Sequence, residues 1–291
     1  MVKAYGNLEE CSRTKRLLGY LRWVSIYVLG VWVMKQFLDL DRVKVLFPLA
    51  LVASALFIVE SIFCPGSLAA KNRAITVAKL KGQSGADYVL FEKNDLKVGW
   101  HIQRPSKTDD RVHLCIPAAF TTKSGTVVGI YAVRGKVGNR KAISKSIGGA
   151  LLIEDGKFRI LPTGGGALFS QSFVGAVEKN KSSLFQQFQI VVSGKAAKFK
   201  DKKLYQMRAL VQFKDGRSGV IESKGDLSFK DFNLDLVGLG VENALYTDMG
   251  AWDEGWYRNQ ESKEGKIVTI GNDRSKTDKQ TNWLVFYDHE L

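Results

Sequence analysis

The sequence is poor in cysteine and histidine, with three of each in 291 residues. Three cysteines at these spacings form neither a disulfide framework nor a zinc site, and the histidines lack the spacing of metal ligands. Cys115 lies in the apolar run VHLCI at residues 112–116, where we expect a small, buried hydrophobic side chain. Nothing in the sequence identifies a cofactor or a metal.

The signature motifs of several large enzyme classes are also missing. The sequence has no G-x-S-x-G nucleophile elbow, no phosphate-binding P-loop and no dinucleotide-binding glycine pattern. It has no RNP, helix-turn-helix or zinc-finger pattern either, so we expect no nucleic-acid partner.

Basic residues nevertheless outnumber acidic ones, and the formal net charge is +14. They are spread along the chain. The densest run comprises Lys195, Lys198, Lys200, Lys202 and Lys203. We interpret this run as a solvated hairpin turn, with a surface facing phosphate or lipid as the alternative.

Two long apolar runs set residues 1–70 apart from the rest. Residues 17–34 (LLGYLRWVSIYVLGVWVM) contain one charge, Arg22, and residues 45–63 (VLFPLALVASALFIVESIF) contain one, Glu60. Each run is close to the ~20 residues that cross a bilayer. Because neither has a polar face, a transmembrane helical hairpin is favoured over a pair of buried core helices.

Two features leave the membrane topology open. The segment from Met34 to Ala69 also resembles a signal peptide that ends in small residues, which would export the domain. Lys and Arg flank the two apolar runs more densely than they populate the loop between them. This distribution mildly favours placing both ends in the cytoplasm.

Residues 75–291 read as one domain built mainly of short β-strands. Apolar and polar residues alternate over four to eight positions, and the turn pairs Asp155-Gly156, Ser193-Gly194 and Asp215-Gly216 predict hairpins. The clearest expected strands are residues 88–91, 112–116, 127–133, 151–153, 188–192, 207–213 and 283–287.

Two segments have helical patterns. Residues 228–240 begin with Ser228 as a plausible N-cap, carry an apolar stripe and end in glycine. Residues 141–146 give a weaker pattern. The expected fold class is therefore α+β, a mixed, largely antiparallel sheet with few helices, preceded by the transmembrane hairpin.

Several segments of this domain occur in a distinctive order. In the C-terminal third they are QFQIVVSG at 187–194, YQMRAL at 205–210, GVIES at 219–223, the helix, and GVENALYTDMG at 240–250. Upstream lie IPAAF at 116–120, GIY at 129–131 and LPTGGG at 161–166.

This order resembles the phosphodiester glycosidase family. The family includes the enzyme that uncovers mannose 6-phosphate by removing N-acetylglucosamine, and many bacterial relatives. Arg208 matches the family's strand arginine, Asp248 matches the aspartate of its N-A-L-x-L-D-G-G/S turn, and Gly250 falls on a small residue of that turn. Ile116 stands where the family has asparagine, and Met249 stands at the first glycine of the turn.

The residues themselves also point to a carbohydrate site. Asp248 ends a β-rich run, and the following segment WDEGWYR at 252–258 combines aromatic rings, carboxylates and a cation, which suits an anionic sugar. The alternative is a loop whose tryptophans cover the core. The candidate substrate-binding residues are Phe120, Thr121, Gly164, Gly165, Gly250, Trp252, Asp253, Glu254, Trp256 and Arg258.

Glycosidic cleavage usually needs two carboxylates, for which Asp248, Glu222, Asp253 and Glu254 are candidates. Arg208 would bind the phosphate bidentately, unless it forms a structural ion pair. The predicted catalytic set is Asp248, Glu222 and Arg208, and backbone N–H groups near Gly164 and Gly165 would contact phosphate.

The predicted function is a membrane-tethered hydrolase of sugar–phosphate bonds in glycans or glycoconjugates. The resemblance implies that the soluble domain faces the extracytoplasmic side, in a bacterial cell envelope. A non-catalytic carbohydrate- or phosphate-binding module is the main alternative, favoured by Ile116 and Met249. A structural envelope protein with a basic surface is the third.

Overall fold

The structure is a computed structural model that describes residues 73–122, 124–249, 254–260, 265–272 and 280–288. The chain divides into two compact units, Met1–Ala70 and Lys71–Leu291, and every described residue belongs to the second. The two predicted membrane spans therefore lie outside the described residues. Among those that are described, no helix has the length and apolar character needed to cross a bilayer.

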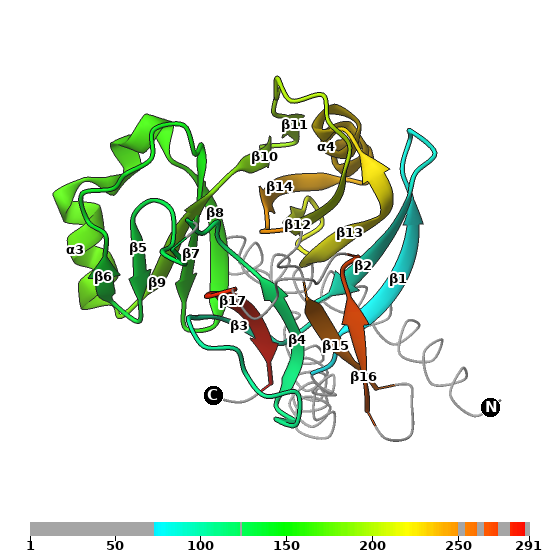
Figure 1. Cartoon of the computed structure of the whole chain (residues 1–291), viewed down its shortest axis with the longest axis horizontal. Helices are drawn as coiled ribbons and strands as arrows, with labels where there is room; N and C mark the ends of the chain where they lie inside the picture. Colours follow the sequence, from blue (N-terminus) through cyan, green and yellow to red (C-terminus); the bar gives the residue numbers. More distant parts are fainter. Residues whose placement is uncertain (1–72, 123, 250–253, 261–264, 273–279, 289–291) are drawn as a thin grey trace, which may run out of the picture. The chain divides into compact units, whose positions relative to one another are not determined.

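Within the described residues, the strands form three sheets in which neighbouring strands run antiparallel (Figure 1). The first sheet has seven strands: β1 (Thr76–Lys81), β2 (Asp87–Glu92), β13 (Ser218–Leu227), β12 (Tyr205–Phe213), β14 (Val241–Tyr246), β10 (Gln189–Val192) and β11 (Lys195–Ala196).

The other two sheets have five strands each. The second sheet consists of β16 (Lys266–Ile270), β15 (Gly255–Asn259), β4 (Val112–Pro117), β17 (Trp283–Tyr287) and β3 (Lys97–His101). The third consists of β6 (Lys136–Gly138), β5 (Tyr131–Val133), β9 (Ser183–Gln187), β7 (Gly149–Glu154) and β8 (Lys157–Pro162).

One apolar core joins the three sheets. It contains residues such as Leu210 and Leu245 from the first sheet, Ile116 and Leu284 from the second, and Phe185 from the third. Because strand side chains alternate between faces, alternate residues of strands such as β4 and β17 point into this central core. Burial of this shared surface holds the sheets together.

Helices cover the outer faces of two sheets. Helix α4 (Phe229–Gly238) packs Phe232 and Leu236 against the first sheet, and α3 (Gln171–Lys179), preceded by the 3₁₀ segment η2 (Gly164–Phe169), covers the third (Figure 1). On the second sheet, the guanidinium of Arg104 lies 4.7 Å from the centre of a Trp283 ring.

The expected class of largely antiparallel sheets with few helices is confirmed. Each predicted turn pair joins two antiparallel strands, and Asp155-Gly156 adopts positive φ at both positions, as a type I′ hairpin turn requires. The division into three sheets was not anticipated, and neither was α3.

The two predicted helices have different outcomes. The helix beginning after Ser228 is confirmed, with the Ser228 hydroxyl accepting a hydrogen bond from the Asp231 N–H at 3.1 Å. The helix predicted at residues 141–146 is wrong. The Gln186 side chain instead bonds both backbone polar groups of Ser144, and the segment follows no helical path.

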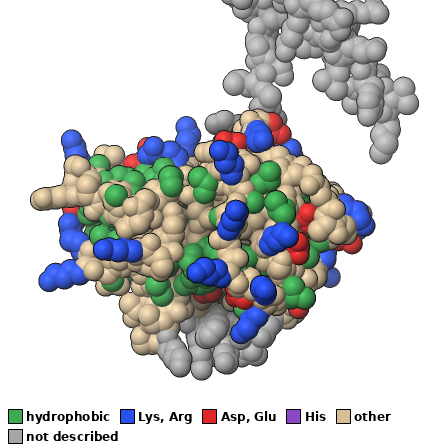
Figure 2. All heavy atoms as spheres, turned by 90° about the horizontal axis from the view of Figure 1, so that it is seen from above, with side chains coloured by type: hydrophobic (Ala, Val, Ile, Leu, Met, Phe, Trp, Pro, Cys, Tyr) green, Lys and Arg blue, Asp and Glu red, His purple; other side chains and the backbone are tan. Residues whose placement is uncertain are grey.

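Basic side chains are dispersed on the face of the folded protein that Figure 2 draws. On the face drawn in Figure 2, Lys and Arg side chains are scattered among apolar and acidic ones rather than gathered in one stripe. All five lysines of the densest run are exposed. This distribution agrees with the interpretation of that run as solvated.

The N-cap of α4, the helix that packs on the first sheet, can be tested directly by substitution. Replacing Ser228 by alanine should lower the free energy of unfolding by about 1 kcal/mol, because the Asp231 N–H loses its partner. Urea unfolding followed by tryptophan fluorescence would measure the change. The matched control is Ser172→Ala, an exposed serine of α3, which should change stability by less than about 0.5 kcal/mol.

Candidate functional site

Strands β12 and β13 place Arg208 and Glu222 directly opposite each other in the first sheet. The Arg208 Nε and Nη2 atoms donate to one Glu222 carboxylate oxygen, at 2.8 and 2.5 Å. The Arg208 side chain is 0% exposed and that of Glu222 is 8% exposed. Such a charge-assisted pair, shielded from water, fixes the direction of the guanidinium.

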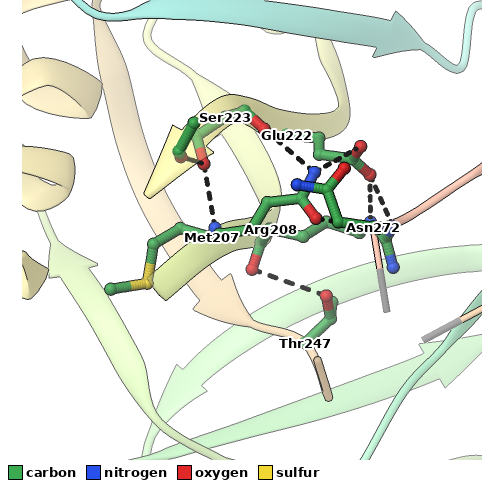
Figure 3. A network of polar contacts seen from close by, with 8 residues as sticks. Met207, Arg208, Glu222, Ser223, Thr247 and Asn272 are labelled. Atoms are coloured by element: carbon green, nitrogen blue, oxygen red, sulfur yellow. Dashed lines mark hydrogen bonds and ion pairs between the residues drawn. The ribbon is translucent and has the colours of Figure 1, made fainter. Parts of the chain in front are cut away.

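The Gln206 amide holds the other oxygen of Glu222, beside a β-bulge. Gln206 Nε2 donates to Glu222 Oε1 at 3.1 Å and to the Ser223 carbonyl at 3.1 Å. The strand register shifts between Gln206 and Arg208, and the Met207 N–H donates to the Ser223 hydroxyl at 2.9 Å. Figure 3 shows Arg208 at the Glu222 carboxylate, with the Met207–Ser223 bond farther along the same strands. Sequence reasoning missed both Gln206 and Ser223.

Asp248 reaches the same end of the sheet from β14. The Thr247 N–H donates to the Arg208 carbonyl at 3.1 Å, and the Asp248 N–H donates to the Ala118 carbonyl at 2.9 Å. Ala118 follows β4 of the second sheet. The chain after β14 therefore joins the first sheet to the second sheet beside Arg208. Backbone contacts thus bring the three predicted catalytic residues into one region, while their catalytic role stays a prediction.

Phe120 and Thr121 follow Ala118 in the chain. The Phe120 ring lies 5.9 Å from that of Tyr246 and 5.4 Å from that of Phe188, measured between ring centres. Thr121 forms an isolated bridge with Val127 and is half-buried. Both residues follow within three positions of Ala118, whose carbonyl accepts the Asp248 N–H.

The glycine-rich turn begins where β8 ends. Gly164 and Gly165 are exposed and have φ values of 56° and 66°, which glycine adopts without the steric cost of a side chain. Pro162, at the end of β8, is opposite Gly149, whose backbone packs against Leu245 of β14. The turn itself is held on the third sheet, where the Thr163 hydroxyl donates to the Ile147 carbonyl at 3.0 Å.

Three other predicted site residues stabilise the second sheet. Trp256 is fully buried beside Cys115, so its ring faces are enclosed. Arg258 donates to four backbone carbonyls, including that of Asp109 at 2.9 Å. Glu254 is bonded to Lys107 and Arg104, at 2.6 and 2.7 Å.

The cations beside Glu254 also set its ionisation. Burial raises the pKa of this carboxyl, but the hydrogen bonds from Lys107 and Arg104 outweigh burial and hold the pKa below its ordinary value. A carboxylate held ionised in this way is poorly suited to act as a general acid. Gly250, Trp252 and Asp253 lie outside the described residues.

A pocket of about 380 Å³ lies elsewhere, against α3 and the residues that precede β7. It is lined by Ile130, Arg140, Ile143, Phe169, Gln171 and Val174. None of the predicted catalytic residues lines it. In the part of the chain that is described, no cluster of three or more His, Cys, Asp or Glu side chains is arranged to hold a metal ion.

Comparison with known proteins finds similarity at the level of fold. No protein-family model matches the sequence, and no curated protein matches it. Among solved structures, the zebrafish N-acetylglucosamine-1-phosphodiester alpha-N-acetylglucosaminidase catalytic domain, auto-inhibited by its pro-peptide, is similar with a TM-score of 0.50. The identity is 12%, over 74% of this chain and 83% of that one.

A hypothetical protein from Synechocystis gives a TM-score of 0.46 at 13% identity, over 74% of this chain and 62% of that chain. The similarity to the zebrafish enzyme shows that the described domain has a fold distantly related to that of a phosphodiester glycosidase. At such identities the similarity shows the fold alone, and it does not place the chain in a bacterial family.

The buried ion pair can be tested by a double-mutant cycle. Arg208→Met or Glu222→Leu alone should each cost about 3–5 kcal/mol, because either leaves an uncompensated buried charge, whereas the double variant should recover much of that loss. Equilibrium urea unfolding measures all four proteins.

The exposed pair Arg159–Glu154 supplies the control for this cycle, and breaking it with Arg159→Met should cost no more than about 1 kcal/mol. If the Arg208 and Glu222 losses simply add in the double variant, the two side chains do not act as a pair.

Proposed function

We propose that the domain hydrolyses the bond between a sugar and a phosphate in glycans or glycoconjugates. The observation that supports the proposal is the backbone bond from Thr247 to Arg208, which makes Asp248 the next residue after one that pairs with the strand of the Arg208–Glu222 pair. The fold similarity to a phosphodiester glycosidase catalytic domain supports a hydrolase of this type. A carbohydrate or sugar phosphate is then the expected substrate.

In this proposal each charged residue has one role. Asp248 acts at the anomeric carbon, as nucleophile or as base for the attacking water, and Arg208 lies toward the phosphate. Water adds across the anomeric C–O bond, which yields a free sugar hydroxyl and a phosphomonoester. A phosphate is a weaker base than an alkoxide, so its departure needs less help from a general acid. This lowers the demand for a second carboxylic acid.

Glu222 acts through Arg208 rather than on the substrate. Its carboxylate fixes the guanidinium, as Gln206 fixes the carboxylate. Preorganised charge of this kind stabilises a transition state without reorganisation during the reaction. The exposed glycines Gly164 and Gly165 offer backbone N–H groups to the substrate, and Phe120 and Thr121 border the same region.

A non-catalytic binding module is the second candidate. Arg208 already has Glu222 as a partner, so a substrate phosphate would compete with an internal carboxylate. Ile116, at the position of the family's asparagine, is a fully buried member of the central core and offers no polar group. The buried Ile116 favours binding without turnover, whereas the Arg208–Glu222 pair weakens phosphate binding under either candidate.

Conversion of Asp248 to asparagine separates the two candidates. Wild type should release free sugar from at least one member of a panel of sugar phosphodiesters, and Asp248→Asn should abolish release with little loss of binding, because the change is nearly isosteric. The exposed Asp226→Asn is the control and should keep full activity. A wild type that binds a panel member but turns over none would establish the binding module instead.

We propose in addition that residues 1–70 tether the domain to a membrane, with the domain on the extracytoplasmic side. The length and uniform apolarity of residues 17–34 and 45–63 support this. The full-length chain should sediment with membranes and resist carbonate extraction, whereas a chain lacking residues 1–70 should appear in the supernatant. Recovery of the full-length chain in the soluble fraction would exclude the tether.

A further inference from the structure

The segment that follows β4 sets the position of the Asp248 backbone. The Ala118 carbonyl accepts the Asp248 N–H at 2.9 Å, and Ala118 and Ala119 are both fully buried. Two alanines offer no side-chain polar group with which to anchor this segment. Other residues must therefore hold it in place.

The side chain of Asn282, immediately before β17, supplies that anchor. Its Oδ1 accepts the Ala119 N–H at 2.6 Å, and its Nδ2 donates to the Ala119 carbonyl at 2.9 Å. One amide thus bonds both backbone polar groups of a single residue, as a neighbouring strand would. Only a side chain with a donor and an acceptor on one short fork can do this.

The Asn282 amide is itself held by Trp100, a residue of the central core. The Trp100 Nε1–H donates to Asn282 Oδ1 at 3.1 Å, and the Trp100 ring packs against Phe185 and Tyr131. Asn282 is 0% exposed. A weaker second contact comes from Gln187, whose Nε2 donates to the Ala118 carbonyl at 3.4 Å. The path from the core to Asp248 therefore runs through Trp100, Asn282 and the Ala118–Ala119 segment.

We propose that Asn282 is a positioning residue, which holds the Ala118–Ala119 segment and through it the backbone of Asp248 for catalysis. This inference rests on the proposed hydrolysis and assigns a role to a residue that does not touch the substrate. A misplacement of about 1 Å in a catalytic group can lower a rate by roughly 100-fold. Loss of the clamp should therefore lower kcat more than it raises KM.

Asn282→Ala removes all three hydrogen bonds, and Asn233→Ala is the matched control. Asn233 is an equally buried asparagine of α4 that donates to the Ala197 carbonyl at 2.9 Å, in the outer core of the first sheet. Both variants lose buried amide bonds and some stability. Only Asn282→Ala should lower kcat, by roughly 10- to 100-fold with KM changed by less than about threefold.

Asn282→Asp provides a pH-dependent rescue. An ionised aspartate still accepts from Ala119 and Trp100 but cannot donate to the Ala119 carbonyl, whereas a protonated one restores the donor. Burial raises the pKa of a carboxyl group at such a site. The ratio of the kcat of this variant to that of wild type should therefore rise as pH falls. A role in stability alone would not restore kcat in this direction.

Amide hydrogen exchange gives a readout that does not depend on activity. Asn282→Ala should speed exchange at the Asp248 amide more than at the Tyr246 amide, which is bonded to the Phe188 carbonyl. Equal acceleration at the two amides, or equal kcat losses in Asn282→Ala and Asn233→Ala, would overturn the positioning role. If wild type releases sugar from no panel member, the proposed hydrolysis fails, and hydrogen exchange alone decides whether Asn282 holds Asp248.

Discussion

The structure depends on hydrogen bonding of buried backbone groups where the three sheets meet. Strand ladders end there, and a buried N–H or carbonyl without a partner costs about 1–3 kcal/mol. Beyond the ends of the strands, side-chain amides supply the hydrogen bonds that strand pairing supplies elsewhere. Gln187 contacts the Ala118 carbonyl, and Asn282 clamps Ala119. The segments around the candidate site are fixed by these amides rather than by regular pairing.

The buried Arg208–Glu222 pair is stable in the same setting because each of its members is bonded. Glu222 receives Arg208 on one oxygen and Gln206 on the other. A pair of this kind adds little net stability, but it holds a guanidinium in a fixed direction inside the protein. An anion-binding role for Arg208 stays a proposal, because its side chain is 0% exposed and already paired with Glu222. The fold similarity alone does not establish such a role, since one fold supports many chemistries.

Local features were predictable because they depend on a few neighbouring residues. The hairpin at Asp155-Gly156 follows from the ability of these residues to adopt positive φ, and the start of α4 follows from the Ser228 hydroxyl. Alternation identified β4 and β12, where one strand face packs into the shared core. The helix predicted at residues 141–146 does not form, because the backbone of Ser144 bonds Gln186, which is 42 positions away in the chain.

The sequence by itself determined the β-rich class, the hairpins, the helix after Ser228 and the set of charged candidates. Only the tertiary structure decided that the strands divide into three sheets, that Arg208 faces Glu222, and that Trp256 is enclosed in the core. The Asn282–Ala119 clamp joins residues 163 positions apart. No local pattern encodes such a contact, because it forms only when β4 and β17 pair and bring the two residues together.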